Sequence, residues 1–460
     1  MRNGAVSHWW ADLGGPPAKR APLAGPTEAD VVIVGAGYTG LWTAWYLKEA
    51  QPDWRIVVLE REHAGFGASG RNGGWLSGLL AGSRERWAEQ FGREGVIAAQ
   101  RAMFATVEEV ADWCVAQDVD CDLVRSGSLD VATSAPALAR LRAKVSWQRD
   151  WTFGEEDWRE LGPDEVRRRV RVHGARGGVF TPHCARVHPA KLARGLADAV
   201  VRAGVELYED TAVTAIEPRV ARTARGDVRA RWVVRATEGY THGLDHRRLV
   251  PMNSAMIATA PLTAEQWAQI GWEGEETLRD AAHAFCYLQR SADGRIAIGG
   301  RGVPYRFGSK TDRAGEVDPR TATELAERLR KLLGVDAPPV HAWAGVLGVA
   351  RDWCPAVTAD AITGLATAGG YVGDGVSTAN LAGRTLRDRI LGRDTALARA
   401  PWTRHAPPRW EPEPLRFVGI HAVYGLYRAA DRVEARTQRP SRFGALATLV
   451  AGRQAFRAST

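Results

Sequence analysis

Several kinds of residue or segment are scarce in this chain of 460 residues, and each shortage excludes a class of protein. No stretch approaches the roughly 20 consecutive apolar residues that a membrane-spanning helix needs, and the first residues contain no apolar signal-peptide core. Only six of the 61 basic residues are lysine, and 53 acidic residues are interleaved with them. We therefore expect no membrane span and no nucleic-acid partner, despite a net charge of +8.

Cysteine is also scarce. The five cysteines form no C-x-x-C pair, and an odd number is a poor disulfide framework. These features favour a reducing, cytoplasmic location. The segment PHCARVH brings His183, Cys184 and His188 close together, but no second pair of ligands follows at zinc-site spacing. We therefore predict no metal site.

One glycine-rich nucleotide turn is present. The apolar run DVVIV has the length of a strand that is covered on both faces of a parallel sheet. It is followed by Gly35, Gly37 and Gly40 in the pattern G-x-G-x-x-G, which allows a tight turn, a close approach to pyrophosphate and a helix packed on the strand. The N-terminus of that helix favours phosphate.

The second strand, RIVVLE, ends at Glu60, about 20 residues after the glycines, where a carboxylate can accept hydrogen bonds from a ribose. This pattern indicates a dinucleotide and disfavours NADP, whereas NAD and FAD both satisfy it. No second glycine-rich strand–turn–helix unit follows residue 245. That absence argues against a separate NAD(P)H domain and against an enzyme that nicotinamide reduces.

The next loop, REHAGFGASGRNGGWLSG, contains six glycines between Arg61 and Gly78. With its ASGRNGG segment, the sequence resembles the family of flavin-dependent amine and D-amino-acid oxidases (DAO), nearest to its gamma-glutamylputrescine oxidoreductase-like branch. Further resemblances follow in the family's order at 185–217, 229–241, 293–305, 343–357 and 368–391. The resemblance covers about residues 28–395 and implies bound FAD.

The resemblance also implies which residues hold FAD. They come from the nucleotide turn, the glycine-rich loop, the strands at 213 and 236, and the closing turn AGGYVGDGV. These residues are Gly35, Gly37, Tyr38, Thr39, Gly40, Glu60, Arg61, Ser69, Gly70, Arg71, Asn72, Gly73, Gly74, Val213, Ala236, Thr237, Gly370, Tyr371, Gly373, Asp374, Gly375 and Val376. Cys286 and Cys354 match no attachment segment, so we predict non-covalent FAD.

The closing turn precedes a helical pattern that begins at Ser377. A helix N-terminus at this point would stabilise negative charge that the flavin ring gains on reduction. Asp374 has two possible roles. Its carboxylate could face the ring and lower the reduction potential, or it could cap the helix, which we predict because aspartate is favoured at that position.

We predict an α/β fold in which a Rossmann-like FAD-binding domain is interleaved with an α+β, mixed-sheet substrate domain. The FAD-binding domain comprises 28–82, 174–245 and 346–395, and the substrate domain comprises 83–173 and 246–345. Residues 396–460 form an extension with a helix that carries Phe417, Ile420, Val423, Tyr424 and Tyr427 on one side. That helix would dock on the protein's own surface, although a subunit or peripheral membrane contact is an alternative.

The family's chemistry implies oxidation of the C–N bond of an amine or amino acid, with hydride transfer to flavin N5 and oxygen as the acceptor, giving hydrogen peroxide. The alternatives are a dehydrogenase that passes electrons to a quinone or carrier protein, and a flavin-binding partner without turnover. Arg301 or Arg351 could hold a substrate carboxylate, and a homo-oligomer is possible. The candidate pocket residues are Trp75, Tyr287, Arg301, Tyr305 and Tyr371.

Overall fold

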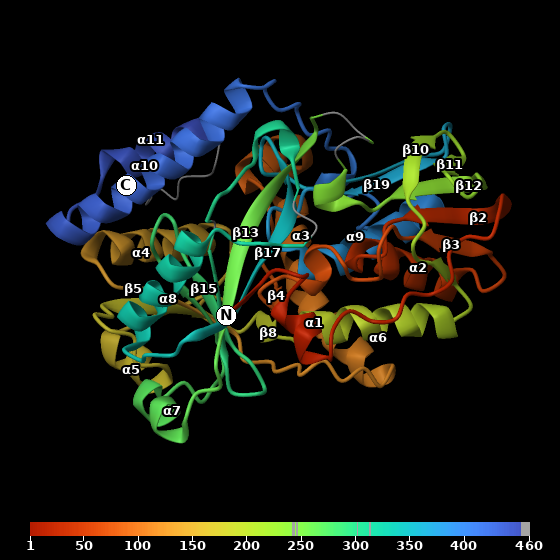
Figure 1. The fold of residues 1–460 in the computed structure, drawn as a ribbon. Coiled ribbons are helices and arrows are strands. Elements are labelled where there is room, and N and C mark those ends of the chain that lie inside the picture. Colours follow the sequence, from red (N-terminus) through yellow and green to blue (C-terminus); the bar gives the residue numbers. More distant parts are fainter. Residues whose placement is uncertain (242–243, 245–246, 301, 312–313, 452–460) are drawn as a thin grey trace.

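Two large sheets organise the protein (Figure 1). The computed structural model describes all residues except 242–243, 245–246, 301, 312–313 and 452–460. One sheet has eight strands and the other has nine. The strands β4 (Trp75–Ser77) and β8 (Cys184–Arg186) form a third, two-stranded sheet. The predicted α/β fold, in which a Rossmann-like unit is interleaved with a mixed-sheet unit, is confirmed.

The eight-stranded sheet has a parallel centre, in which β2 pairs with β3 and β12, and β3 pairs with β9. Its inner strands are continuous apolar runs because both faces are buried. Val31 and Ile33 pack with the helices, whereas Val32 and Val34 face the other way and pack with Leu23 and Ala221. Helices α2 (Tyr38–Ala50), α6 (Pro189–Arg202) and α9 (Gly375–Ile390) pack beside this sheet, with α2 between the other two. The strands are β2 (Thr27–Val34), β3 (Ile56–Leu59), β9 (Glu206–Tyr208), β10 (Val213–Glu217), β11 (Val220–Thr223), β12 (Val228–Arg235), β18 (Ala356–Asp360) and β19 (Leu365–Gly369).

The nine-stranded sheet has the order β1-β17-β13-β16-β15-β14-β5-β7-β6. Its strands are β1 (Arg2–Asn3), β5 (Ser128–Ala132), β6 (Arg159–Leu161), β7 (Gly177–Thr181), β13 (Leu249–Thr259), β14 (Thr277–Asp280), β15 (Tyr287–Arg290), β16 (Ile296–Gly300) and β17 (Pro339–Ala350). The accompanying helices are α1 (His8–Asp12), α3 (Arg84–Ala116, with a non-helical residue at Gly92), α4 (Ala135–Asp150), α5 (Pro163–Arg169), α7 (Ala264–Ile270) and α8 (Pro319–Leu333). Single-turn 3₁₀ helices are η1 (Ala68–Gly70), η2 (Glu238–Tyr240), η3 (Phe307–Ser309) and η4 (Pro401–Thr403).

The interleaving of the two sheets along the chain follows the predicted pattern, but two boundaries differ. Strand β7 falls in the range predicted for the FAD-binding domain, yet it pairs with β5 and β6 of the nine-stranded sheet. Strand β17 continues across the predicted boundary at 346. Local apolar patterns indicate strands but not which sheet they join, since that depends on distant partners. The domain assignment as a whole stays a prediction.

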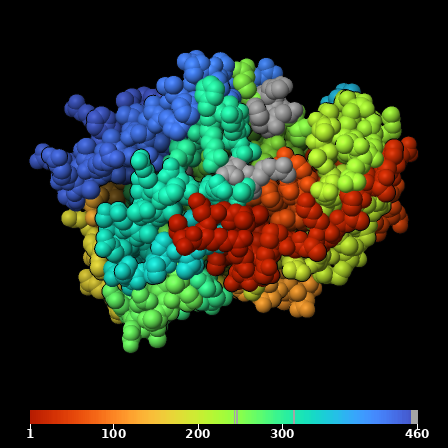
Figure 2. Space-filling model, in the orientation of Figure 1, coloured from red at the N-terminus to blue at the C-terminus, as the bar shows by residue number. Residues whose placement is uncertain are grey.

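The N-terminal segment links the two sheets. Strand β1 pairs with β17 in the nine-stranded sheet, and the Leu23 N–H donates to Thr211 Oγ1 at 3.0 Å beside the other sheet. Figure 2 shows this segment, coloured red, crossing the visible face of the molecule.

The C-terminal extension forms two helices, α10 (Leu415–Thr437) and α11 (Arg442–Ala451), along one edge of the molecule (Figure 1). Ile420, Tyr424 and Tyr427 of α10 are buried against Val250 and Val349 of the nine-stranded sheet. The predicted apolar side of this helix thus docks on the protein's own surface. Within the described residues, no helix combines the length and apolarity needed to cross a membrane.

All five cysteines are free and buried. Cys114 and Cys121 lie close together, with their Sγ atoms 3.7 Å apart. The cytoplasmic location stays a prediction.

Candidate active site

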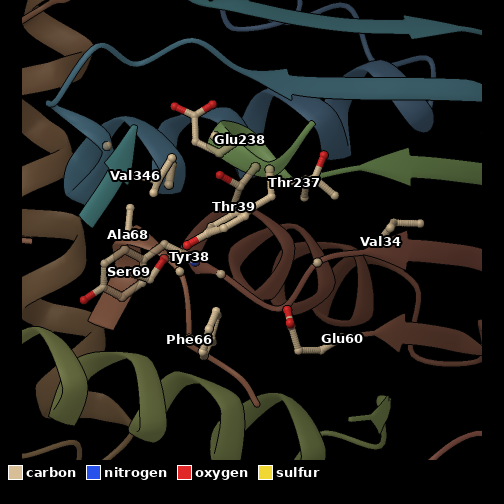
Figure 3. Close-up of a pocket in the computed structure, with 18 of the residues that line it drawn as sticks. Val34, Tyr38, Thr39, Glu60, Phe66, Ala68, Ser69, Thr237, Glu238 and Val346 are labelled. Atoms are coloured by element: carbon tan, nitrogen blue, oxygen red, sulfur yellow. Dashed lines mark hydrogen bonds between the residues drawn. The ribbon is translucent and has the colours of Figure 1, made fainter. Parts of the chain in front are cut away.

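A pocket opens at the carboxyl ends of β2, β3 and β12 (Figure 3). Val34, Leu59 and Ala236, at or just after the ends of these strands, lie in its wall. In parallel sheets, ligands bind in the crevice beyond these strand ends. The pocket encloses about 1160 Å³ of empty space, part of it open to solvent, so it is large enough for a dinucleotide.

The nucleotide turn has the predicted geometry. Gly35 has φ +104°, and a Cβ atom there would lie 2.7 Å from the carbonyl oxygen of Ala236. Gly37 lines the pocket directly before α2. Because it has no side chain, it does not cap the first amides of the helix. The N-terminal amides of α2 therefore begin at the pocket, where they can bind a pyrophosphate. Gly40 does not line the pocket. It lies where α2 packs closely on the turn, and a Cβ atom there would collide with the carbonyl oxygen of Gly35.

Glu60 lies at one end of the pocket (Figure 3). Its carboxylate accepts hydrogen bonds from the N–H groups of Ala36 at 2.8 Å and Glu62 at 2.9 Å. Burial raises the pKa of Glu60 to about 7, although these bonds oppose the shift. Val213 and Arg61 line the same end. A carboxylate here can accept a ribose hydroxyl, so the donors and acceptors of the pocket fit a dinucleotide cofactor.

The glycine-rich loop lies only partly along the pocket. Ser69 and Asn72 line it, and Ser69 Oγ accepts from the Tyr38 N–H at 2.8 Å. Arg71 does not line it, because its guanidinium points inward and donates to the carbonyl oxygens of Phe66 (2.8 Å) and Ala344 (3.3 Å).

The three glycines of the loop that were also predicted to hold FAD lie outside the lining of this pocket and pack against protein. Gly70 contacts Trp10 and Gly73 contacts the ring of Tyr287, while Gly74 contacts Gln289. Their task in this structure is close packing of the loop, since any side chain there would collide with these neighbours.

The closing turn forms the opposite end of the pocket. Tyr371, Gly373, Gly375 and Val376 line it, and the Tyr371 hydroxyl lies 3.1 Å from Thr39 Oγ1 on α2. Ala236 and Thr237, which were also predicted to hold FAD, line the pocket as well. Gly370 lies behind the turn, outside the pocket lining.

The predicted helix-capping role of Asp374 is wrong. Asp374 occupies the N-cap position of α9, but its side chain makes no capping hydrogen bond. Its backbone, with φ −95° and ψ 34°, is not in the extended conformation that directs an N-cap side chain onto the helix amides. Its carboxylate instead acts on Lys144 and Arg279, whose protonated forms it favours electrostatically.

Glu238 is a site residue that sequence reasoning missed. It follows Thr237 in the turn after β12 and lines the pocket with φ +41°, an uncommon value for a residue other than glycine. Its carboxylate accepts from the N–H groups of Gly370 at 2.9 Å and Tyr371 at 3.3 Å. Burial raises the pKa of Glu238 to about 7, against the effect of these bonds. Glu238 therefore ties the end of β12 to the closing turn.

Twelve further lining residues were also missed, and all but Thr211 and Tyr240 have no polar side chain. They are Val34, Leu59, Phe66, Gly67, Ala68, Thr211, Gly239, Tyr240, Leu244, Val346, Leu347 and Ala379. Val346 and Leu347 lie in the segment 343–357, which the family resemblance includes.

The candidate substrate residues do not all lie at one site. Trp75 and Tyr287 are neighbours whose ring centroids lie 6.2 Å apart. Tyr305 is fully buried under α10, where its hydroxyl donates to Glu413 at 2.6 Å, so it lies outside the pocket. Arg351 forms an ion pair with Glu411 at 2.9 Å. Arg301 lies outside the described residues.

Known proteins resemble the chain over most of its length. Residues 30–389 match the family described as FAD dependent oxidoreductase (DAO). Gamma-glutamylputrescine oxidoreductase of Escherichia coli (strain K12) is 31% identical over 88% of this chain and 93% of its own. Glycine oxidase of Geobacillus kaustophilus is 25% identical over 82% of this chain and 97% of its own.

Solved structures share the fold. The crystal structure of glycine oxidase from Geobacillus kaustophilus has a TM-score of 0.65 at 23% identity and covers 82% of this chain and 99% of its own. L-amino acid deaminase from Proteus vulgaris, with its specific insertion deleted, has a TM-score of 0.66 at 17% identity. It covers 87% of this chain and 99% of its own. Given the matched family model and the nucleotide pocket, the chain belongs to the DAO family of FAD-dependent oxidoreductases.

Proposed function

We propose that this enzyme oxidises the C–N bond of an amine or amino acid to an imine, with oxygen as the electron acceptor and hydrogen peroxide as the second product. The observation that carries the proposal is the pocket from Glu60 to the closing turn, which Asn72 lines and next to which Gly73, Trp75 and Tyr287 pack together. The names of the relatives support amines and amino acids as the substrate class. Gamma-glutamylputrescine is therefore the first compound to test.

FAD, when bound, would accept the hydride that leaves the substrate carbon. The chain's own residues would hold and position the reactants. The amides at the start of α2 would bind the pyrophosphate, Glu60 the ribose, and α9 would direct its positive N-terminal end towards the closing turn. Trp75 and Tyr287 would exclude water and present aromatic faces to the amine.

Anaerobic mixing with a panel of amines and amino acids tests the proposal. We expect at least one amine to bleach the flavin absorbance and air to restore it rapidly, with one hydrogen peroxide formed per turnover. Slow recovery in air but fast recovery with a quinone would instead indicate the dehydrogenase. Failure of every amine to bleach the flavin, while a 2-hydroxy acid does so, would contradict the substrate class.

FAD is proposed to be held without a covalent bond. The described lining of the pocket contains no cysteine or histidine side chain that could be linked to the ring. Acid precipitation of the purified protein should therefore leave the yellow colour in the supernatant. Colour that stays with the precipitate would contradict this prediction.

A further inference from the structure

A second, smaller pocket adjoins the loop that is proposed to hold FAD. It is lined by Trp75, Ser77 and Gly78 at the end of that loop, and by side chains of the nine-stranded sheet and α4. Among these side chains are Asp130, Lys144 and Arg279, which are charged. Charged groups are rarely placed in a protein interior unless they are paired or have a function.

The sheet register places this pocket beside the candidate substrate residues. Asp130 on β5 pairs with Arg279 on β14, and Arg279 pairs with Tyr287 on β15. Partners in a register face the same side of a sheet, and neighbouring strands lie about 4.8 Å apart. Tyr287 in turn packs on Gly73, where a Cβ atom would lie 2.8 Å from its ring. A single row of side chains therefore leads from the glycine-rich loop to the charged pocket.

Lys144 and Arg279 carry more N–H donors than the described residues accept. Arg279 donates hydrogen bonds from its Nε and one Nη to the carboxylate of Asp130. Lys144 Nζ donates to the same carboxylate at 3.0 Å. Among the described residues, neither cation has another hydrogen-bond acceptor. A lysine carries three N–H donors and an arginine five, so five of the eight have no acceptor in the described part of the chain.

The charges lining the pocket are also unequal. Lys144 and Arg279 oppose one carboxylate, Asp130, while His183 is paired with Asp157 at 2.7 Å. Lys144 has only 8% of its surface exposed and lies over the ring of Trp158 at 4.4 Å. Asp374, outside the pocket lining, favours the charged forms of both cations. A carboxylate is the ligand that matches unused guanidinium and ammonium donors.

We propose that this pocket is a subsite in which Arg279 and Lys144 bind a carboxylate at the far end of an amine substrate. The proposal rests on the proposed amine oxidation and narrows its substrate class to amines that carry a remote carboxylate. Trp75 and Trp158 would form the apolar walls along the connecting chain. Because Tyr287 and Asp130 are two strand spacings apart, the row of side chains from Tyr287 to Asp130 spans roughly 10 Å.

Matched pairs of amines test the subsite in the FAD-loaded enzyme. We compare ω-aminocarboxylates of about four to eight carbons with n-alkylamines of equal length, a range chosen to span two strand spacings. Hydrogen bonds to charged groups contribute enough for a tenfold or larger effect. The longer aminocarboxylates should therefore show kcat/KM values at least about tenfold above their alkylamine partners, mainly through a lower KM.

The substitution Lys144→Met removes one cation and leaves the paired Arg279 and Asp130 in place. It should reduce the preference for aminocarboxylates by about tenfold. Arg142→Met is the matched control, because Arg142 lies on the same helix α4 but forms an exposed ion pair with Glu160 outside the pocket. It should keep the preference. Thermal unfolding of both variants checks that the fold is intact.

Calorimetric titration with hexanoate, which has no amine, gives a readout independent of turnover. Hexanoate should bind the loaded enzyme and bind Lys144→Met about tenfold more weakly, whereas hexanol should not distinguish the two. If amines bleach the flavin but neither the preference nor hexanoate binding depends on Lys144, the subsite is wrong and the proposed function stands. If no amine bleaches the flavin, the proposed function fails, and the hexanoate titration still decides whether the carboxylate site exists.

Discussion

Gly37→Val should yield a folded protein that purifies almost without FAD. Gly37 lines the pocket at the start of α2, and a Cβ atom there would already lie 3.0 Å from Ser69 Oγ. The branched methyl groups would occupy the space in front of the helix amides that a pyrophosphate needs. Loss of about 3 kcal/mol of binding free energy corresponds to an affinity more than 100-fold weaker. The ratio of flavin to protein absorbance measures the effect.

Two further substitutions make this test specific. At Gly419, on the exposed side of α10, an added Cβ meets nothing within 4 Å, so Gly419→Val should keep full FAD content. Gly40→Ala should lose stability as well as FAD, because its methyl group would collide with the carbonyl oxygen of Gly35. Full FAD occupancy in Gly37→Val would contradict the assignment of this turn to the cofactor.

The second large effect concerns pH and Glu238. Burial raises the pKa values of Glu60 and Glu238 to about 7, above the value of about 4.3 for an unfolded glutamate. Between these values the folded protein binds more protons than the unfolded chain. The stabilisation is therefore complete below pH 4.3 and is lost as pH rises through 7. We expect the free energy of unfolding of the FAD-free protein to fall between pH 5 and pH 8.

Glu238→Gln should remove its share of this dependence, which is at most about 3 kcal/mol. The variant should also be less stable at pH 5, because glutamine keeps one acceptor oxygen and its NH₂ group is only a donor, so one of the N–H groups of Gly370 and Tyr371 loses its acceptor. Urea unfolding at both pH values measures these changes. Glu265→Gln, at an exposed position on α7, serves as control. An unchanged pH dependence in Glu238→Gln would show that this carboxyl group does not hold the proton.

The parts of the site that are formed by residues close together in the sequence were predictable from the sequence. The turn at Gly35 and Gly37 lies between a strand and a helix that are consecutive in the chain, and its glycines are required by local backbone geometry. Glu60 ends the next strand of the same parallel sheet, so it had to reach the same edge. The closing turn and α9 follow the same local logic.

The tertiary structure decided which distant segments meet. Glu238 reaches the closing turn across 132 residues, Arg71 turns inward to Ala344, and β7 joins the other sheet. Asp130, Arg279 and Tyr287 come together only because β5, β14 and β15 are neighbours. Hydrophobic periodicity determines which face of a strand is buried, whereas strand pairing depends on contacts summed over the whole fold. The sequence therefore determined the family and the nucleotide turn, and the paired strands determined where the charged pocket lies.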